Sequence, residues 1–230
     1  EAWRNSGFQT TWLTWVSLGV LVVLFPASSI LLSEDPSVTL RSLNDTMRLI
    51  MLLGTMLIQW LGFVVLVAAV ELERTGLQGL GFKRIRGIDF AWAGAFFLAA
   101  WVILSGLAWL LAQMGMPMSG DIKFLVPQDA FGRVVWVGVS ITAGVVEETA
   151  FRGYLMTRMR LVGKLQSWVI PVIVSSVIFG SLHAYQGIPG MIVITAYGIL
   201  FALLYIRTGS IWPGIFAHFF QDFLALFIPQ

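Results

Sequence analysis

Long apolar segments separated by short polar turns dominate the sequence. A helix needs about 20 mostly apolar residues to cross a bilayer, because each residue advances the helix by about 1.5 Å. The segments predicted to span are residues 11–32, 47–70, 90–113, 130–161, 167–184, 191–206 and 211–228. The pattern therefore predicts an all-α polytopic transmembrane bundle of about seven spans. With no internal repeat, residues 1–230 are interpreted as a single integral membrane domain.

The composition supports this interpretation. Of the 230 residues, 58% are hydrophobic and only 11% are charged, whereas soluble domains carry about 25% charged residues. Such a chain cannot cover a water-facing surface, so the lipid bilayer is its expected surrounding. The lack of cysteine excludes disulfides, thiolate metal sites and cysteine nucleophiles. A net charge of +2 gives no reason to expect nucleic acid as a partner.

Basic side chains are distributed unevenly between the two sets of turns. With the N-terminus inside, the inner side holds Arg4, Arg74, Lys83, Arg84, Arg86, Arg152, Arg158, Arg160, Lys164 and Arg207. The outer side holds Arg41, Arg48, Lys123 and Arg133. Because lysine and arginine favour the cytoplasmic side, an N-in orientation is predicted. The fourth segment is too long for one crossing, and its end with Arg158 and Arg160 is expected to protrude into water.

Ionisable side chains inside the later apolar segments are the candidates for chemistry. They are Glu147, Glu148, Arg152, His183, His218 and Asp222. Charged groups at membrane depth are costly and are functional candidates by default. If the turn after the fourth segment is centred near residues 164–165, Glu147 and His183 lie at nearly equal depth. His218 lies about 15 Å from the inner turn before its own segment, so the three are predicted to converge in the inner half of the membrane.

The acidic pair divides into two roles by spacing. Glu148 and Arg152 are four residues apart with the acid first, the favourable order for a helical ion pair, so they can also be mere scaffold. Glu147 points about 100° away and has no basic partner in its own helix. It is therefore the candidate general base.

The histidines are open to two interpretations. A histidine within an apolar segment can be a packed strut, but His218 has Asp222 four residues later, where a carboxylate can orient the imidazole or stabilise its cationic form. Phe179 shares a helix face with His183. It is interpreted either as one wall around that imidazole or as an ordinary packing or lipid-facing aromatic residue.

Three motifs now stand in order along the chain. They are Glu147-Glu148-x-x-x-Arg152, Phe179-x-x-x-His183 and His218-x-x-x-Asp222. With these motifs the chain resembles the CAAX-processing and bacteriocin-processing (CPBP, or Abi) intramembrane proteases over about its last hundred residues. Residues 80–83 also look like a short Leu-Gly segment of that family. The resemblance implies a metal-independent glutamic endopeptidase without cofactor, with its catalytic core in residues 131–228 and a membrane-associated peptide or protein as substrate.

The resemblance also implies a role for each residue. Glu147 and His183 would activate water, His218 and Asp222 would lie at the oxyanion, and Glu148, Arg152 and Phe179 would support them. The family accepts Asn or Asp at the last position, and an ionised carboxylate cannot donate a hydrogen bond to an oxyanion. Asp222 is therefore expected to be protonated or turned towards His218, which leaves His218 as the donor.

Three alternatives remain open from the sequence. Glu147, His183 and His218 form an acceptable zinc ligand set for a metalloprotease. The chain can instead be a non-enzymatic scaffold or bacteriocin-immunity protein of the same fold. A proton-coupled transporter is the third alternative, although the sequence shows no pair of repeated halves of the kind found in many transporters. Short loops suggest a prokaryotic inner (plasma) membrane protein, which disfavours a prenylated substrate. The predicted depth of the ionisable residues, in the inner half of the membrane, puts the active site towards the cytoplasm. The sequence assigns neither a substrate nor an oligomeric state.

Overall fold

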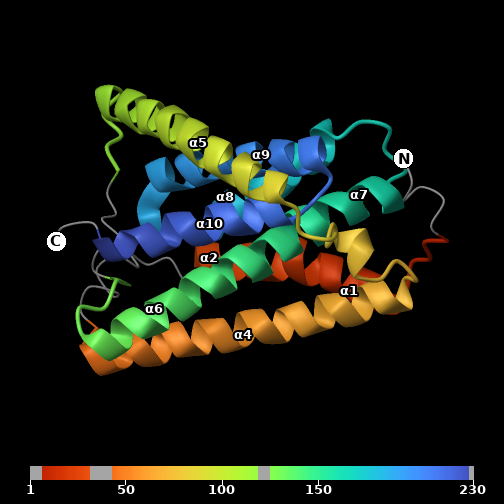
Figure 1. The fold of residues 1–230 in the computed structure, drawn as a ribbon, viewed down its shortest axis with the longest axis horizontal. Coiled ribbons are helices and arrows are strands. Elements are labelled where there is room, and N and C mark those ends of the chain that lie inside the picture. The colour runs from red at the N-terminus through yellow and green to blue at the C-terminus, as the bar shows by residue number, and fades with distance from the viewer. Residues whose placement is uncertain (1–6, 32–42, 119–124, 228–230) are drawn as a thin grey trace.

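The computed structural model describes residues 7–31, 43–118 and 125–227, and the regular structure of these residues is helical (Figure 1). The α-helices are α1 (Trp12–Gly19), α2 (Phe25–Leu31), α4 (Asp45–Leu72), α5 (Gly87–Gln113), α6 (Ala130–Thr142), α7 (Met156–Val162), α8 (Val169–Ser181), α9 (Gly187–Thr208) and α10 (Trp212–Leu224). Shorter π and 3₁₀ segments are η2 (Val20–Leu24), η3 (Leu77–Leu80), η5 (Ala143–Glu147), η6 (Thr149–Leu155), η7 (Ala184–Gln186) and η8 (Ala225–Phe227). The predicted all-α bundle is confirmed, and about seven apolar helical stretches result when Trp12–Ser29 and Ala130–Val162 are each taken as one continuous helix.

Five helical stretches in the described part of the chain are long and apolar enough to cross a bilayer. They are Trp12–Ser29, Asp45–Leu72, Gly87–Gln113, Ala130–Val162 and Ala184–Thr208. The helices α8 and α10 coincide with the other two predicted spans, but each has 13 residues. At about 1.5 Å per residue each is about 20 Å long, less than the roughly 30 Å hydrocarbon core.

Local sequence signals set the helix ends. Asn44 and Asp129 cap α4 and α6, because their side chains accept hydrogen bonds from the backbone amides of Met47 and Gly132. The helix α9 ends at Gly209, which has the left-handed φ of 59° that glycine adopts without strain. These ends agree with the turns predicted from the sequence.

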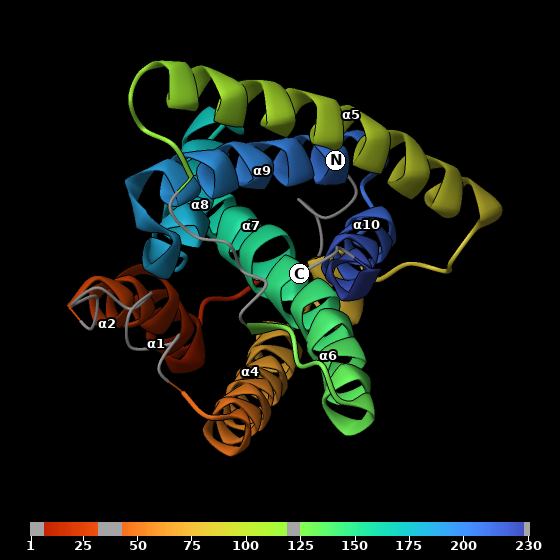
Figure 2. The ribbon, with the colours of Figure 1, turned by 90° about the vertical axis from the view of Figure 1, so that its left-hand side faces the viewer.

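The helices form two groups with α10 between them. Figure 1 shows α4 beside α6 along one side and α5 beside α9 along the other, and α10 packs against both α5 and α6. Figure 2, turned by 90°, shows α1 and α2 as a separate pair beside α4. The ends of α4, α7 and α9 lie towards the right of Figure 1. Basic residues predicted to be inside stand at or next to these ends: Arg74, Arg160, Lys164 and Arg207. Arg152, in contrast, is buried within η6. The N-in orientation stays a prediction, and Arg4, Arg41 and Lys123 lie outside the described residues.

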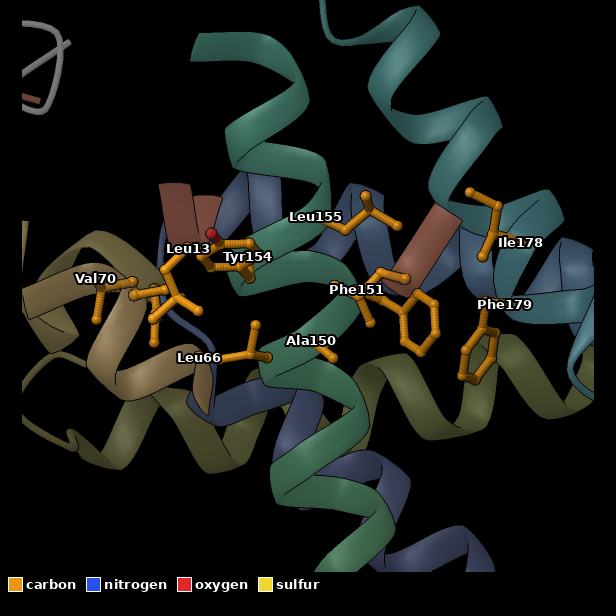
Figure 3. Close-up of a cluster of buried hydrophobic side chains, with 12 residues drawn as sticks. Leu13, Leu66, Val70, Ala150, Phe151, Tyr154, Leu155, Ile178 and Phe179 are labelled. Carbon is orange, nitrogen blue, oxygen red and sulfur yellow. The ribbon is translucent and has the colours of Figure 1, made fainter. Parts of the chain in front are cut away.

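The helix that carries the acidic motif runs through the largest apolar core. Residues of η6 pack there against side chains from α1, α4 and α8 (Figure 3). Those labelled in Figure 3 are Leu13, Leu66, Val70, Ala150, Phe151, Tyr154, Leu155, Ile178 and Phe179. All seven residues of η6 are buried. A helix buried on every side is held in place by tertiary packing, which fixes the acidic motif relative to the rest of the bundle.

A buried ion pair corrects one prediction. Arg158 was expected in water, but it is 0% exposed, and its guanidinium lies 2.8 Å from the Glu73 carboxylate, which is also 0% exposed. Arg158 donates further hydrogen bonds to Gly79 O and Thr75 Oγ1, and Tyr154 donates to Glu73. The prediction was wrong because the partner of Arg158 stands 85 positions earlier, at the end of α4. Arg160 is half-buried near the end of α7, over the ring of Trp168.

Arg158→Met is expected to destabilise the fold, because it leaves the Glu73 carboxylate buried without its counter-charge. Breaking a buried pair in this way costs about 3–5 kcal/mol. Glu73→Gln combined with Arg158→Met should recover part of that loss, since no unpaired charge remains. Detergent-induced unfolding of the purified protein measures both, with the exposed Arg133→Met as control. Equal stability of Arg158→Met and wild type would contradict the assigned role.

Candidate active site

The acidic pair lies in the continuous helical stretch Ala130–Val162, here called the central helix, at the point where it departs from α-helical geometry. Glu147 ends the π-helical segment η5, and Glu148 separates it from the second π-helical segment, η6. A π-helical turn bonds residue i to i+5 and is frequent at functional sites. The regular 100° step per residue, on which the sequence prediction relied, therefore does not hold here. The extra residue per turn changes the directions in which Glu147 and Glu148 point.

Glu148 connects a guanidinium and an imidazole inside the protein. Its Oε1 accepts a hydrogen bond from Arg152 Nη1 at 2.8 Å and another from His218 Nδ1 at 3.0 Å. The Glu148 side chain is 2% exposed. The predicted ion pair with Arg152 is thus present. The sequence predicted that Glu148 would support Glu147. In the structure the hydrogen bonds of Glu148 go to Arg152 and to the imidazole of His218.

Arg152 is enclosed by rings and backbone. Its guanidinium carbon lies 4.3 Å from the ring centre of Phe179 and 4.9 Å from that of Phe201. Its second terminal nitrogen donates to the carbonyl of Gly198 on α9 at 3.3 Å. Cation–π contacts of this kind strengthen when they are desolvated. Phe179 is therefore a buried packing residue of the site, and the lipid-facing interpretation is wrong.

The other nitrogen of His218 faces two carboxylates. Its Nε2 lies 3.8 Å from Glu147 Oε2 and 3.7 Å from Asp222 Oδ2, both too long for hydrogen bonds. Asp222 is turned towards His218 as expected, while Glu148 provides the hydrogen bond that orients the imidazole. The side chains of Glu147 and Asp222 are 20% and 29% exposed, against 7% for His218. The accessible side of the cluster is thus the side of Glu147 and Asp222.

His183 adjoins this cluster through Phe179. Its Nδ1 lies 3.0 Å from the Phe179 carbonyl, which can only accept, so Nδ1 carries the proton and Nε2 is the free acceptor. The Phe179 ring centre is 5.1 Å from that of His183 and 6.2 Å from that of His218. The six predicted ionisable residues therefore lie in one neighbourhood.

Gln59 is a residue of the site that the motifs did not reveal. Its side-chain amide, on α4, donates a hydrogen bond to Glu147 Oε1 at 3.1 Å. The sequence offered a signal, because Gln59 is a single carboxamide within the long apolar stretch 49–70. Gln59 carries no ionisable group, so it is not among the ionisable residues of the three motifs.

Part of the chain is similar to known proteins. Residues 128–224 match the family described as Type II CAAX prenyl endopeptidase Rce1-like. This match supports the resemblance of the segment to the CPBP/Abi family. The protein named "Putative membrane peptidase YdiL" from Bacillus subtilis (strain 168) is 30% identical over 145 residues, which cover 62% of this chain and 57% of that protein. The chain thus matches little more than half of that relative's length. No solved structure matches significantly.

The family segment includes the three motifs and leaves Gln59 outside. Its residues combine carboxylates, imidazoles and one guanidinium, a set suited to proton transfer and to stabilising developing charge. Among residues 7–31, 43–118 and 125–227, no three His, Asp or Glu side chains are arranged to hold a metal ion. The three ligands considered for zinc are therefore not placed as a coordination site in this arrangement.

Gly144→Ala is expected to disturb the site through its backbone. A methyl group on Gly144 would lie 2.8 Å from Ile215 O and 3.1 Å from Phe219 N, on either side of His218 in α10. Overpacking against backbone typically costs about 1–3 kcal/mol, so the protein should unfold at lower temperature.

Gly138→Ala is the matched control for Gly144→Ala. Its methyl group would meet the flexible end of Met56, at 2.9 Å. Thermal unfolding of the purified proteins compares the two variants. If both unfold at the same temperature, the close approach of α10 at Gly144 is not required for stability.

Proposed function

We propose that this protein is an intramembrane endopeptidase that hydrolyses a peptide bond of a membrane-associated protein or peptide without a metal ion. The family match of residues 128–224 and the name of the Bacillus subtilis relative support a peptidase. The five apolar helices long enough to span support a membrane setting. The bacterial relative favours a prokaryotic plasma membrane, and the gathering of basic residues at one end favours a site towards the cytoplasm.

One observation supports the mechanism most directly. Glu147 is a partly accessible carboxylate that bonds to a neutral amide, next to an imidazole with which it makes no hydrogen bond. Its neighbour Glu148 is buried and bonded to a guanidinium. An accessible carboxylate whose hydrogen-bond donor is neutral can accept a proton, so Glu147 is assigned as the general base.

The reaction begins with a water molecule next to Glu147 and His183. Glu147 takes a proton from the water, with the free Nε2 of His183 as a second acceptor, and the oxygen attacks the peptide carbonyl. A tetrahedral intermediate with a negatively charged oxygen forms. The C–N bond then breaks, and the departing amine takes the proton from the base. The products are a new carboxyl terminus and a new amino terminus.

His218 stabilises the oxyanion of that intermediate. Its Nδ1 donates to Glu148, so Nε2 donates to the oxyanion when the imidazole is cationic, and the three nearby carboxylates favour that cation. The site is largely closed to water, which strengthens the interaction with developing charge. Asp222 acts on His218 through its charge, and donation by Asp222 itself is not required.

Glu147→Gln should abolish cleavage, because an amide cannot take the proton from water. The measurement compares peptides of membranes and medium from cells that express wild type, Glu147→Gln, or Glu71→Gln as control for an exposed carboxylate. Peptides cut at one bond should appear with wild type and with Glu71→Gln alone. Identical profiles for all three would point to a non-enzymatic scaffold. Loss of cutting by wild-type membranes in a chelator, restored by zinc, would point to a metalloprotease.

Asp222→Asn should retain much of the activity, within about tenfold of wild type. The carboxylate lies 3.7 Å from His218 Nε2 without a hydrogen bond, and an amide can donate where a carboxylate cannot. The rate of cutting by purified protein in phospholipid vesicles tests this. Complete loss of cutting by a folded Asp222→Asn protein would refute the role given to Asp222.

A further inference from the structure

Gln59 lies in the middle of an apolar helix that is long enough to cross a bilayer, where a polar carboxamide is unusual. It is the fifteenth residue of α4, about 21 Å from the start of that helix, so it is remote from both of its ends. A polar side chain in that setting is costly unless it is hydrogen-bonded. The partner it finds is Glu147, 88 positions later in the chain, and the donating amide is 3.1 Å from Oε1.

The two oxygens of Glu147 consequently have different surroundings. Oε1 accepts a hydrogen bond from Gln59, while Oε2 lies 3.8 Å from His218 Nε2 without a hydrogen bond to it. The hydrogen bond from Gln59 restricts the rotation of the Glu147 carboxylate. Because Gln59 is neutral, it adds no counter-charge. Arg152 does the opposite for Glu148, whose charge it neutralises at 2.8 Å.

The packing of α4 on α6 fixes the height of Gln59. Trp60 Nε1 donates to Thr142 Oγ1 at 3.0 Å, and the end of Met56 lies over Gly138. These contacts join α4 to the same continuous helical stretch, Ala130–Val162, that carries Glu147, but they do not involve Glu147 itself. They let the effect of helix packing be separated from the effect of the amide.

We propose that Gln59 is a positioning residue of the active site, which holds Glu147 so that Oε2 faces the attacking water. The inference rests on the proposed function, since it assigns how α4, outside residues 128–224, serves the base. Gln59 acts through Glu147 and does not contact the substrate. Its loss should therefore lower kcat and leave KM unchanged.

The experiment uses the purified protein in phospholipid vesicles and a quenched fluorescent peptide that copies the cleavage site mapped in cells. Gln59→Met keeps the length of the side chain and removes the donor. Hydrogen bonds to charged groups are worth about 10-fold to 100-fold in an equilibrium, and a fall of that size is expected in kcat. Trp60→Phe removes the neighbouring bond between the same helices, and its kcat should stay within about twofold of wild type.

Gln59→Glu supplies a readout that a packing role would not move. At neutral pH the introduced carboxylate repels Glu147, so kcat should fall further than in Gln59→Met. At acidic pH the introduced carboxyl binds a proton and becomes a donor again. Its activity relative to wild type should then rise, whereas that of Gln59→Met should not change with pH. Because this variant is nearly isosteric with wild type, it decides the matter if Gln59→Met does not fold.

The outcomes separate the two proposals. If wild type and Glu147→Gln cut the peptide equally, the proposed function fails. If Glu147→Gln alone is inactive and Gln59→Met matches Trp60→Phe in kcat, the role of Gln59 is overturned. A rise in KM at constant kcat would also overturn it, since that result indicates substrate contact. The role of Gln59 is also overturned if the activity of Gln59→Glu relative to wild type does not rise at acidic pH.

Discussion

The hydrogen bonds of the Glu148 carboxylate are the interaction on which the rest of the site depends. They join Arg152 on the central helix to His218 on α10, and the guanidinium in turn bonds to α9. Removing these charges from water is costly, and a buried cluster of this kind persists only where each member keeps its partners. The side chain of Glu148 is therefore both the counter-charge of Arg152 and the orienting group of the imidazole. Three helices must be in place before His218 can point at Glu147.

Backbone geometry makes that cluster possible. Gly144 lets α10 approach the central helix closely enough for a backbone contact, and the π-helical turns on both sides of Glu148 change the directions of neighbouring side chains. Neither feature is a matter of side-chain chemistry. A regular α-helix with a larger residue at position 144 would carry the same acidic motif without bringing it to His218. The motif is thus necessary for the site, and the local backbone decides whether the motif is assembled.

The sequence was informative where the physics is local. Apolar length predicted the positions of the helices, because the cost of exposing backbone or charge to lipid constrains every spanning segment. It failed where partners are distant. Arg158 was interpreted as water-facing because Glu73 lies 85 positions away, and the bond of Gln59 to Glu147 crosses 88. Spacing within one helix also favoured Asp222 as the partner of His218, whereas the hydrogen-bonded carboxylate, Glu148, comes from another helix.

Two adjacent carboxylates can serve different purposes only if their surroundings differ. Glu148 is closed off and hydrogen-bonded to the guanidinium of Arg152, so it is part of the framework of the site. The preceding residue, Glu147, is partly accessible and accepts a hydrogen bond from an amide that carries no charge. A cation in the place of Gln59 would hold Glu147 equally well, yet it would stabilise the carboxylate against proton uptake. In the proposed mechanism, a neutral donor holds the geometry and leaves Glu147 free to accept a proton. That distinction explains why an amide, and no lysine or arginine, reaches Glu147 from α4.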